Sequence, residues 1–249
     1  MKNEWKAVWN NRKPADIIGD NNFEQTFLYL KSCMGVKIDS TTTSTAFLEQ
    51  FKANLAKMEK GMDADKQHSF FEVGCGSAPY LYYIANNRDC LQLGGVDYSV
   101  PLIDIAKKIM FSPHVNANVK ELYCGEAIEI DVTEKYDCVY SRSVFQYFPS
   151  VEYGMEVAQK MIEKANHGIG LFDLFDVQKS EDFLSYRRSV VENYDSKYAE
   201  TPHQFYSKEL FQKLAKKNNC EVVFSRDSLK GYWNEPFVFD VYLYKRNSF

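Results

Sequence analysis

The stretch Phe71–Ala78 reads FEVGCGSA, follows a short apolar run and is itself followed directly by Pro79. This pattern predicts a β-strand over residues 69–73, a Gly-x-Gly turn and a helix that begins at Pro79, because proline is tolerated in the first turn of a helix. Glycines in such a turn allow unusual backbone dihedral angles and place no side chain between the main chain and a ligand. Open α/β sheets bind ligands at the carboxyl ends of their parallel strands. We therefore expect a ligand site at this turn.

The turn differs from the turn that binds dinucleotides. A dinucleotide-binding turn has the pattern Gly-x-Gly-x-x-Gly, in which the third glycine allows the helix to pack closely on the strand. In this chain the third position is Pro79, and the acidic residue Glu72 precedes the first glycine by two positions. A nicotinamide-dependent oxidoreductase is therefore an alternative that requires a glycine where the chain has proline.

The residues Glu72, Gly74 and Gly76 resemble motif I (E/DxGxG) of the class I S-adenosylmethionine-dependent methyltransferases. The resemblance covers about residues 69–173 and the end of the chain. It implies an α/β fold with a Rossmann-like, seven-stranded, mostly parallel sheet and a closing antiparallel β-hairpin. It also implies S-adenosyl-L-methionine as cofactor and S-adenosyl-L-homocysteine as product. The backbone of Gly74, Cys75 and Gly76 would approach the methionyl end, and Glu72 would hold its amino group.

Further cofactor contacts are expected at the ends of the next strands. Asp97 and Tyr98 stand in the sequence GGVDYS, about 20 residues past the glycines, where a carboxylate that binds the ribose hydroxyls is expected. Glu126 and Ala127 follow a glycine and are similar to the family's GDA turn, which implies that Glu126 accepts from the adenine amino group. The alternative for Glu126 is an ordinary surface carboxylate. Ser141, after the fourth strand, is expected to contact the cofactor.

Strand-like and helix-like patterns alternate from about residue 69 onward, which is typical of a parallel sheet flanked by helices. Strands are expected over residues 69–73, 91–96, 119–123, 136–140, 168–172, 221–225 and 237–244, and helices over 79–87, 101–110, 151–165 and 208–217. Residues 178–206 are a polar, aromatic insert with helical patterning over 183–198. We expect this insert to lie over the acceptor pocket of a methyltransferase domain that spans residues 66–249.

Residues 1–65 precede the part of the chain that this fold requires. Their apolar pattern predicts an amphipathic helix over residues 46–58. The apolar residues at helical spacing are Phe47, Phe51, Leu55 and Met58. We interpret residues 1–65 as a helical cover on the sheet or as a lid over the cofactor, and the resemblance favours the lid.

Methyl transfer to a hydroxyl needs a general base, whereas transfer to a neutral amine needs mainly alignment and desolvation. His203 is the candidate base, and Tyr206, three positions later, is assigned with it to the catalytic site. The alternative for His203 is a capping or packing role. Asp173 and Asp176, after the fifth strand, are candidates for acceptor contacts, with ordinary loop carboxylates as the alternative.

A looser resemblance concerns the class of acceptor. The pattern H-x-x-Y-S-K-E that begins at His203 is similar to one in small-molecule methyltransferases found with bacterial surface-polysaccharide genes. The spacing of Trp5 and Trp9 is similar as well. This resemblance implies a sugar-like or phosphate-type precursor as the acceptor.

Composition and charge restrict the partners. A formal net charge of −4 argues against nucleic acid, which requires a basic face. The chain also lacks the Asn/Asp-Pro-Pro-aromatic motif and the Pro-Cys pair of DNA methyltransferases. The six cysteines never form C-x-x-C and no histidine cluster accompanies them, so we expect no metal. The first residues lack the apolar region of a signal peptide and no run is long enough to span a membrane, so we expect a cytoplasmic protein without a membrane partner.

These observations predict an S-adenosylmethionine-dependent methyltransferase that acts on a hydroxyl of a small molecule or of a sugar- or phosphate-type precursor. The alternatives are an N-methyltransferase of a small molecule and a non-catalytic cofactor-binding partner of another methyltransferase. The expected partner is the small-molecule acceptor, and a homodimer is considered as the oligomeric state.

Overall fold

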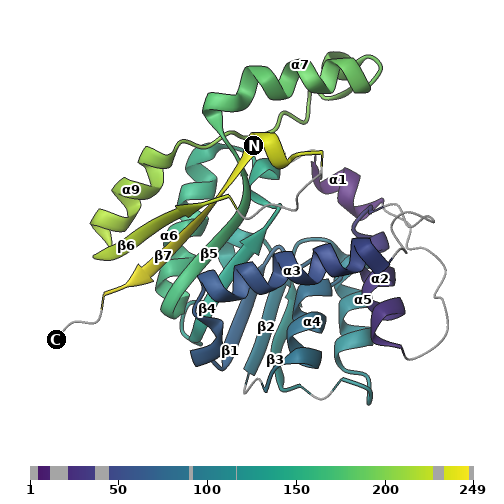
Figure 1. Cartoon of the computed structure of the whole chain (residues 1–249), viewed down its shortest axis with the longest axis vertical. Coiled ribbons are helices and arrows are strands. Elements are labelled where there is room, and N and C mark those ends of the chain that lie inside the picture. The colour runs from purple at the N-terminus through teal and green to yellow at the C-terminus, as the bar shows by residue number, and fades with distance from the viewer. Residues whose placement is uncertain are drawn as a thin grey trace.

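The computed structural model describes residues 5–11, 22–36, 45–89, 92–115, 117–226 and 233–246. They form one seven-stranded sheet with helices on both faces (Figure 1). The strands are β1 (Ser69–Val73), β2 (Gln92–Asp97), β3 (Val119–Cys124), β4 (Tyr136–Arg142), β5 (Ala165–Phe175), β6 (Cys220–Ser225) and β7 (Val238–Lys245).

The strand order is β3-β2-β1-β4-β5-β7-β6. Strands β1 to β5 run parallel, whereas β7 is antiparallel to both β5 and β6. The predicted fold class, including the closing antiparallel hairpin, is confirmed. The chain leaves β1 toward β2 on one side and returns at β4 on the other, so the carboxyl ends of β1 and β4 flank the topological switch point at which such sheets bind ligands.

The two faces of the sheet carry separate apolar cores. The longer helices are α1 (Trp5–Asn10), α2 (Phe23–Cys33), α3 (Thr45–Gly61), α4 (Pro79–Asn87), α5 (Val100–Met110), α6 (Val151–Lys164), α7 (Ser180–Val190) and α9 (Lys208–Lys217). Helices α2 to α5 pack on one face, and α3 crosses that face in Figure 1. Helices α6 and α9 pack on the other face. Burial of apolar side chains on both faces is expected for a parallel sheet.

The expected amphipathic helix over 46–58 is confirmed as part of α3. Phe51, Leu55 and Met58 are buried in the core, and the side chain of Phe47 lies outside the described part. The fifth strand is longer than expected, because Ala165 already pairs with Tyr136 of β4 and Phe175 still pairs with Val238 of β7.

The helical pattern expected over 183–198 forms two helices. Helix α7 ends at Val190, and the short α8 (Tyr194–Lys197) follows. Between them Val191 is extended and Asn193 has φ 53°, a left-handed conformation that ends a helix. Phe183 and Tyr194 form a third apolar cluster with Phe175 at the end of β5, which anchors the insert over that end of the sheet.

No helix in the described ranges combines the length and the apolar character needed to cross a bilayer. The same ranges hold no group of three or more histidine, cysteine or acidic residues placed to bind a metal ion.

Candidate active site

The turn after β1 needs both of its glycines. Gly74 has φ 77° and Gly76 has φ 54°, values that strain any other residue. A Cβ atom at Gly74 would overlap the side chain of Val144, and one at Gly76 would overlap the sulfur of Met34. The turn is tied to β2, since the amides of Gly74 and Cys75 donate to the carbonyl of Val96 at 2.8 Å and 3.0 Å.

Helix α2 is bonded to the same turn. The hydroxyl of Ser77 is buried and donates to the carbonyl of Leu30 at 2.7 Å. Together with Met34, which lies over Gly76, this bond fixes the end of α2 against the glycine turn. The end of α2 therefore lies against the glycine turn.

Asp97 ends β2 beside the turn and has a buried carboxylate. Its Oδ2 accepts from the amide of Gly76 at 2.9 Å, and its Oδ1 accepts from the amide of Ser99 at 2.9 Å. Burial raises the pKa of Asp97 to about 6, and the two backbone hydrogen bonds limit this rise. The carboxylate thus stands at the switch point with lone pairs left for a ligand.

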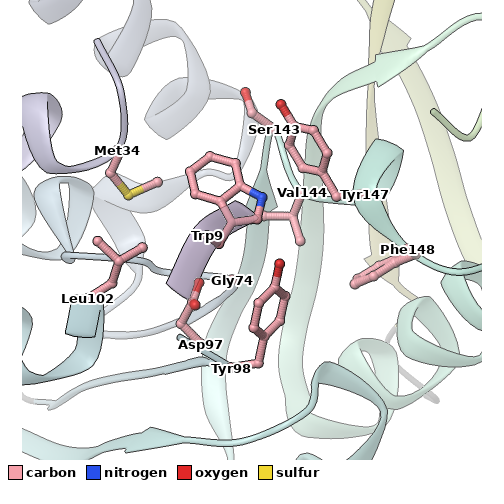
Figure 2. A pocket seen from close by; sticks show the side chains of 10 residues that line it. All are labelled: Trp9, Met34, Gly74, Asp97, Tyr98, Leu102, Ser143, Val144, Tyr147 and Phe148. Carbon is pink, nitrogen blue, oxygen red and sulfur yellow. The ribbon is translucent and has the colours of Figure 1, made fainter. Parts of the chain in front are cut away.

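A small cavity of about 40 Å³ opens above the turn (Figure 2). The residues that line it are Trp9, Met34, Gly74, Asp97, Tyr98, Leu102, Ser143, Val144, Tyr147 and Phe148. We call it the glycine-turn cavity. In the view of Figure 2 the indole of Trp9 lies amid the other side chains, between Asp97 and Ser143. The hydroxyl of Tyr98 is buried and has no hydrogen-bond partner among the described residues, as expected for a group that awaits a ligand.

A second cavity, also of about 40 Å³, adjoins the first and has charged and hydroxyl groups in its wall. It is lined by Lys31, Val36, Phe51, Tyr80, Arg142, Ser143 and Asp173. We call it the polar cavity. Ser143 lines both cavities, so the two meet at this residue.

The wall between the cavities is built at the ends of β4 and β5. The hydroxyl of Ser143 donates to Oδ2 of Asp173 at 2.5 Å, and Nε of Arg142 lies 3.2 Å from the same oxygen. Ser143 and Asp173 have φ 54° and 59°, a strained conformation typical of functional sites. The amide of Asp173 donates to the carboxylate of Asp240 at 2.9 Å, which holds the strained backbone in place.

Three of the cofactor residues predicted from the sequence, Gly74, Asp97 and Tyr98, line the glycine-turn cavity. Two others lie in the core beneath it. Glu72 is buried, accepts from the hydroxyl of Tyr140 at 3.3 Å, and has a pKa that burial raises well above its usual range. Ser141 donates to the carbonyl of Val73 at 2.8 Å, so its hydroxyl joins β4 to β1.

The remaining predicted cofactor residues lie at the rim or in the core. Cys75 is fully buried, and the amide of Gly76 is used by Asp97. Glu126 is partly exposed and pairs with Lys6 at 2.8 Å, so α1 reaches the loop after β3. Ala127 is buried among the apolar residues of the α6 face.

The predicted catalytic pair lies apart from the polar cavity. His203 lies among aromatic rings, with ring centroids 4.9 Å from Trp5, 5.7 Å from Tyr147 and 5.4 Å from Phe183. Burial, assisted by the charge of Arg187, lowers its pKa to about 4. Tyr206 is fully buried, and its hydroxyl donates to the carbonyl of Phe145 at 2.9 Å. Through this hydrogen bond, Tyr206 stabilises the loop after β4.

Several lining residues were not predicted. Lys31 lies in α2, a helix that the sequence analysis did not predict, and Tyr80 lies in the predicted helix that begins at Pro79. Arg142 and Ser143 follow Ser141, the residue that was predicted. The one available signal was the polar run SRS within an otherwise apolar strand end, which begins at Ser141.

The strand order, with a cavity above β1 and β2, is that of the Rossmann-like class I S-adenosylmethionine-dependent methyltransferase fold. Residues 71–168 match the model of a methyltransferase domain family. A malonyl-[acyl-carrier protein] O-methyltransferase from Priestia megaterium is 26% identical over 111 residues, which are 45% of this chain and 38% of that protein. The chain thus matches well under half of the length of this curated relative.

Solved methyltransferases share the fold at low identity. Magnesium protoporphyrin IX methyltransferase from Synechocystis with bound S-adenosylhomocysteine superposes with a TM-score of 0.59 at 10% identity, covering 85% of this chain and 89% of that one. The N-methyltransferase NodS from Bradyrhizobium japonicum, also with S-adenosylhomocysteine, superposes with a TM-score of 0.57 at 12% identity. The match covers 92% of this chain and 100% of that one. These likenesses show that the chain shares the fold of these methyltransferases.

The affinity for the cofactor product is expected to depend on pH through Asp97. A carboxylate that accepts from ribose hydroxyls must be ionised, and burial raises the pKa of Asp97 to about 6. Below that pH the proton must leave before binding, so affinity falls by about tenfold per pH unit. Calorimetric titration with S-adenosylhomocysteine at pH 5 and pH 8 should show weaker binding at pH 5 by about tenfold. The affinity of the Asp97→Asn variant, which cannot ionise, should not depend on pH. A wild-type affinity that is independent of pH would contradict the proposed role of Asp97.

Proposed function

We propose that this protein transfers the methyl group of S-adenosylmethionine to a hydroxyl oxygen of a small polar molecule, such as a sugar- or phosphate-type precursor. The observation that carries the proposal is the meeting of the two cavities at Ser143. One cavity has the residues of a cofactor site, and the other has the charged and hydroxyl groups that a polar acceptor requires. Direct contact between the two sites is what methyl transfer needs, because the acceptor atom must be aligned with the reacting methyl group.

In this proposal the glycine-turn cavity holds the cofactor. Asp97 would accept from the ribose hydroxyls, Tyr98 would use its unpartnered hydroxyl, and the backbone at Gly74 would approach the methionyl end. Glu72 and Glu126 keep their predicted roles toward the amino group and the adenine. When bound, S-adenosylmethionine supplies a methyl group activated by its sulfonium.

Asp173 is proposed as the general base. Its carboxylate lines the polar cavity and is positioned by Ser143 and Arg142. A carboxylate there would accept the proton of the acceptor hydroxyl as the oxygen becomes nucleophilic. His203 stays the second candidate; its lowered pKa keeps it neutral and able to accept a proton, but it lies behind Tyr147 in the aromatic cluster.

Residues 1–65 are proposed to act as a lid. Trp9 of α1 and Met34 after α2 line the glycine-turn cavity, and Lys31 lines the polar cavity. The acceptor and the cofactor would thus both be enclosed by this segment.

Methylation of a nitrogen is the alternative that a comparison favours, since NodS is an N-methyltransferase of the same fold. A neutral amine needs alignment and desolvation rather than a base at Asp173. A non-catalytic partner subunit would bind the cofactor without turnover and would form a stable complex with another methyltransferase.

The test is a screen for acceptor-dependent release of S-adenosylhomocysteine by the purified protein. Sugars, sugar phosphates and small amines are supplied in parallel, and the methylated atom is located by NMR. We expect turnover with a hydroxyl acceptor and an O-methyl product. An N-methyl product would establish the alternative, and binding of S-adenosylhomocysteine without turnover on any acceptor would support the non-catalytic partner.

A further inference from the structure

We propose that the polar cavity recognises an oxyanion, a carboxylate or a phosphate group, on the acceptor, and that Lys31 is the residue that binds it. This inference rests on the proposed function, because it takes the polar cavity as the acceptor site. It adds a substrate class: the methylated molecule is an anion.

The charges on the cavity wall do not balance. Arg142 and Asp173 form a pair with 3.2 Å between Nε and Oδ2. Lys31 adds a second cation, and its ammonium donates at 2.8 Å to the uncharged hydroxyl of Tyr80. Lys31 forms no ion pair with any residue in the described ranges. The wall of the polar cavity therefore carries two basic side chains, Lys31 and Arg142, and one carboxylate, Asp173.

Glu72 is the other acidic group near Lys31, and it is a poor counterion. Its carboxyl is bonded to the hydroxyl of Tyr140, and burial raises its pKa well above the usual range, which favours the uncharged acid. Glu72 does not line the polar cavity. A buried ammonium is costly without a charged partner, and an anionic ligand in the cavity would favour the charged form of Lys31.

The surroundings of Lys31 hold its ammonium in position. Its Nζ lies 4.6 Å from the ring centroid of Tyr80 and 4.7 Å from that of Phe51, so aromatic faces support the cation on two sides. Burial, followed by the repulsion of Arg142, lowers its pKa to about 7. An ammonium has three donors, and Tyr80 uses one, so donors remain for the oxygens of a ligand.

The position of Lys31 in the cavity wall also fits the proposed reaction. Lys31 and Ser143 line the same cavity, and Ser143 faces the cofactor cavity as well. An acceptor anchored by its anionic group at Lys31 would present a hydroxyl toward Ser143 and Asp173.

The first arm of the test measures anion binding directly. Inorganic phosphate and malonate are titrated into the protein in the presence of S-adenosylhomocysteine, and binding is followed by calorimetry. We expect at least one of the two to bind, and which one binds separates phosphate from carboxylate recognition. The Lys31→Met variant should weaken that binding by about tenfold or more, as loss of a charge-assisted hydrogen bond implies. The Lys31→Arg variant should retain part of the anion affinity of the wild type.

The control variant is Lys108→Met, which removes an exposed lysine of α5 that does not line the polar cavity. It should bind the anion as the wild type does. Melting temperatures of all variants check that they are folded. The inference is overturned if neither anion binds the wild type, or if Lys31→Met and Lys31→Arg both bind like the wild type.

The second arm separates this inference from the proposed function. Glucose is compared with glucose 6-phosphate and glucuronate as acceptors in the S-adenosylhomocysteine release assay. Preference for an anionic acceptor, lost in Lys31→Met through a raised KM, supports the inference. Equal turnover of charged and uncharged acceptors overturns the inference while the methyl transfer stands. Anion binding that depends on Lys31 without turnover of any acceptor overturns the proposed function while the anion site stands.

Discussion

Replacement of Asp97 by alanine is expected to weaken the binding of S-adenosylhomocysteine by at least about 100-fold. The reason is that its carboxylate, which lines the glycine-turn cavity, is proposed to accept from two ribose hydroxyls. Hydrogen bonds to a charged group contribute about 1.5–3 kcal/mol each, and 1.4 kcal/mol corresponds to tenfold in affinity. Calorimetry on the wild type and the variant measures the effect.

Asp104→Ala is the matched control, because it removes an exposed aspartate of α5 that lines neither cavity. It should bind like the wild type. Asp97→Asn adds a second comparison, since it retains an acceptor oxygen for the amide of Gly76 and so preserves the turn. Wild-type affinity in Asp97→Ala would show that the ribose lies elsewhere.

Replacement of Asp173 by asparagine is expected to lower kcat by about 100- to 10,000-fold, the range that a general base contributes. Asparagine keeps the shape of the side chain but cannot take the proton of the acceptor hydroxyl. The affinity for S-adenosylhomocysteine should change by less than about threefold, because Asp173 lines the polar cavity and not the glycine-turn cavity. Steady-state kinetics with the acceptor found in the screen measures the effect.

Two comparisons make this prediction specific. Asp176→Asn is the control on the same strand end, because its carboxylate accepts from the amide of Gln178 and lies outside the polar cavity. His203→Asn tests the other candidate base. A large loss of kcat in His203→Asn with little loss in Asp173→Asn would indicate that His203 is the base. Little loss of kcat in both variants would favour an amine acceptor.

The parts of the site that could be predicted from the sequence are local. Gly74 and Gly76 are constrained by the backbone of one turn, and Asp97 follows one strand at a fixed distance from it, so short stretches of sequence contain the necessary information. The seven-stranded sheet with its closing hairpin was predicted through the family resemblance, whereas the alternating pattern alone indicated only an α/β sheet.

The polar cavity could not be predicted, because its residues come from distant segments. Lys31 meets Tyr80 and Arg142 only when α2, α4 and the end of β4 are packed together. The choice between Ser141 and Ser143 depended on which side chain faces the cavity, and this is decided by the left-handed backbone at Ser143. His203 was predicted to be catalytic because of its neighbours in the sequence. In the structure its ring packs against aromatic rings from α1, β5 and α7.

The bond between Ser77 and Leu30 has a consequence for the order in which ligands bind. It joins the glycine turn to the end of α2, and that short segment places Met34 in one cavity and Lys31 in the other. A ligand that contacts this segment in one cavity is therefore expected to affect the binding of a ligand in the other. Thermodynamic linkage then requires the effect to be reciprocal: the acceptor tightens the cofactor by the same factor by which the cofactor tightens the acceptor.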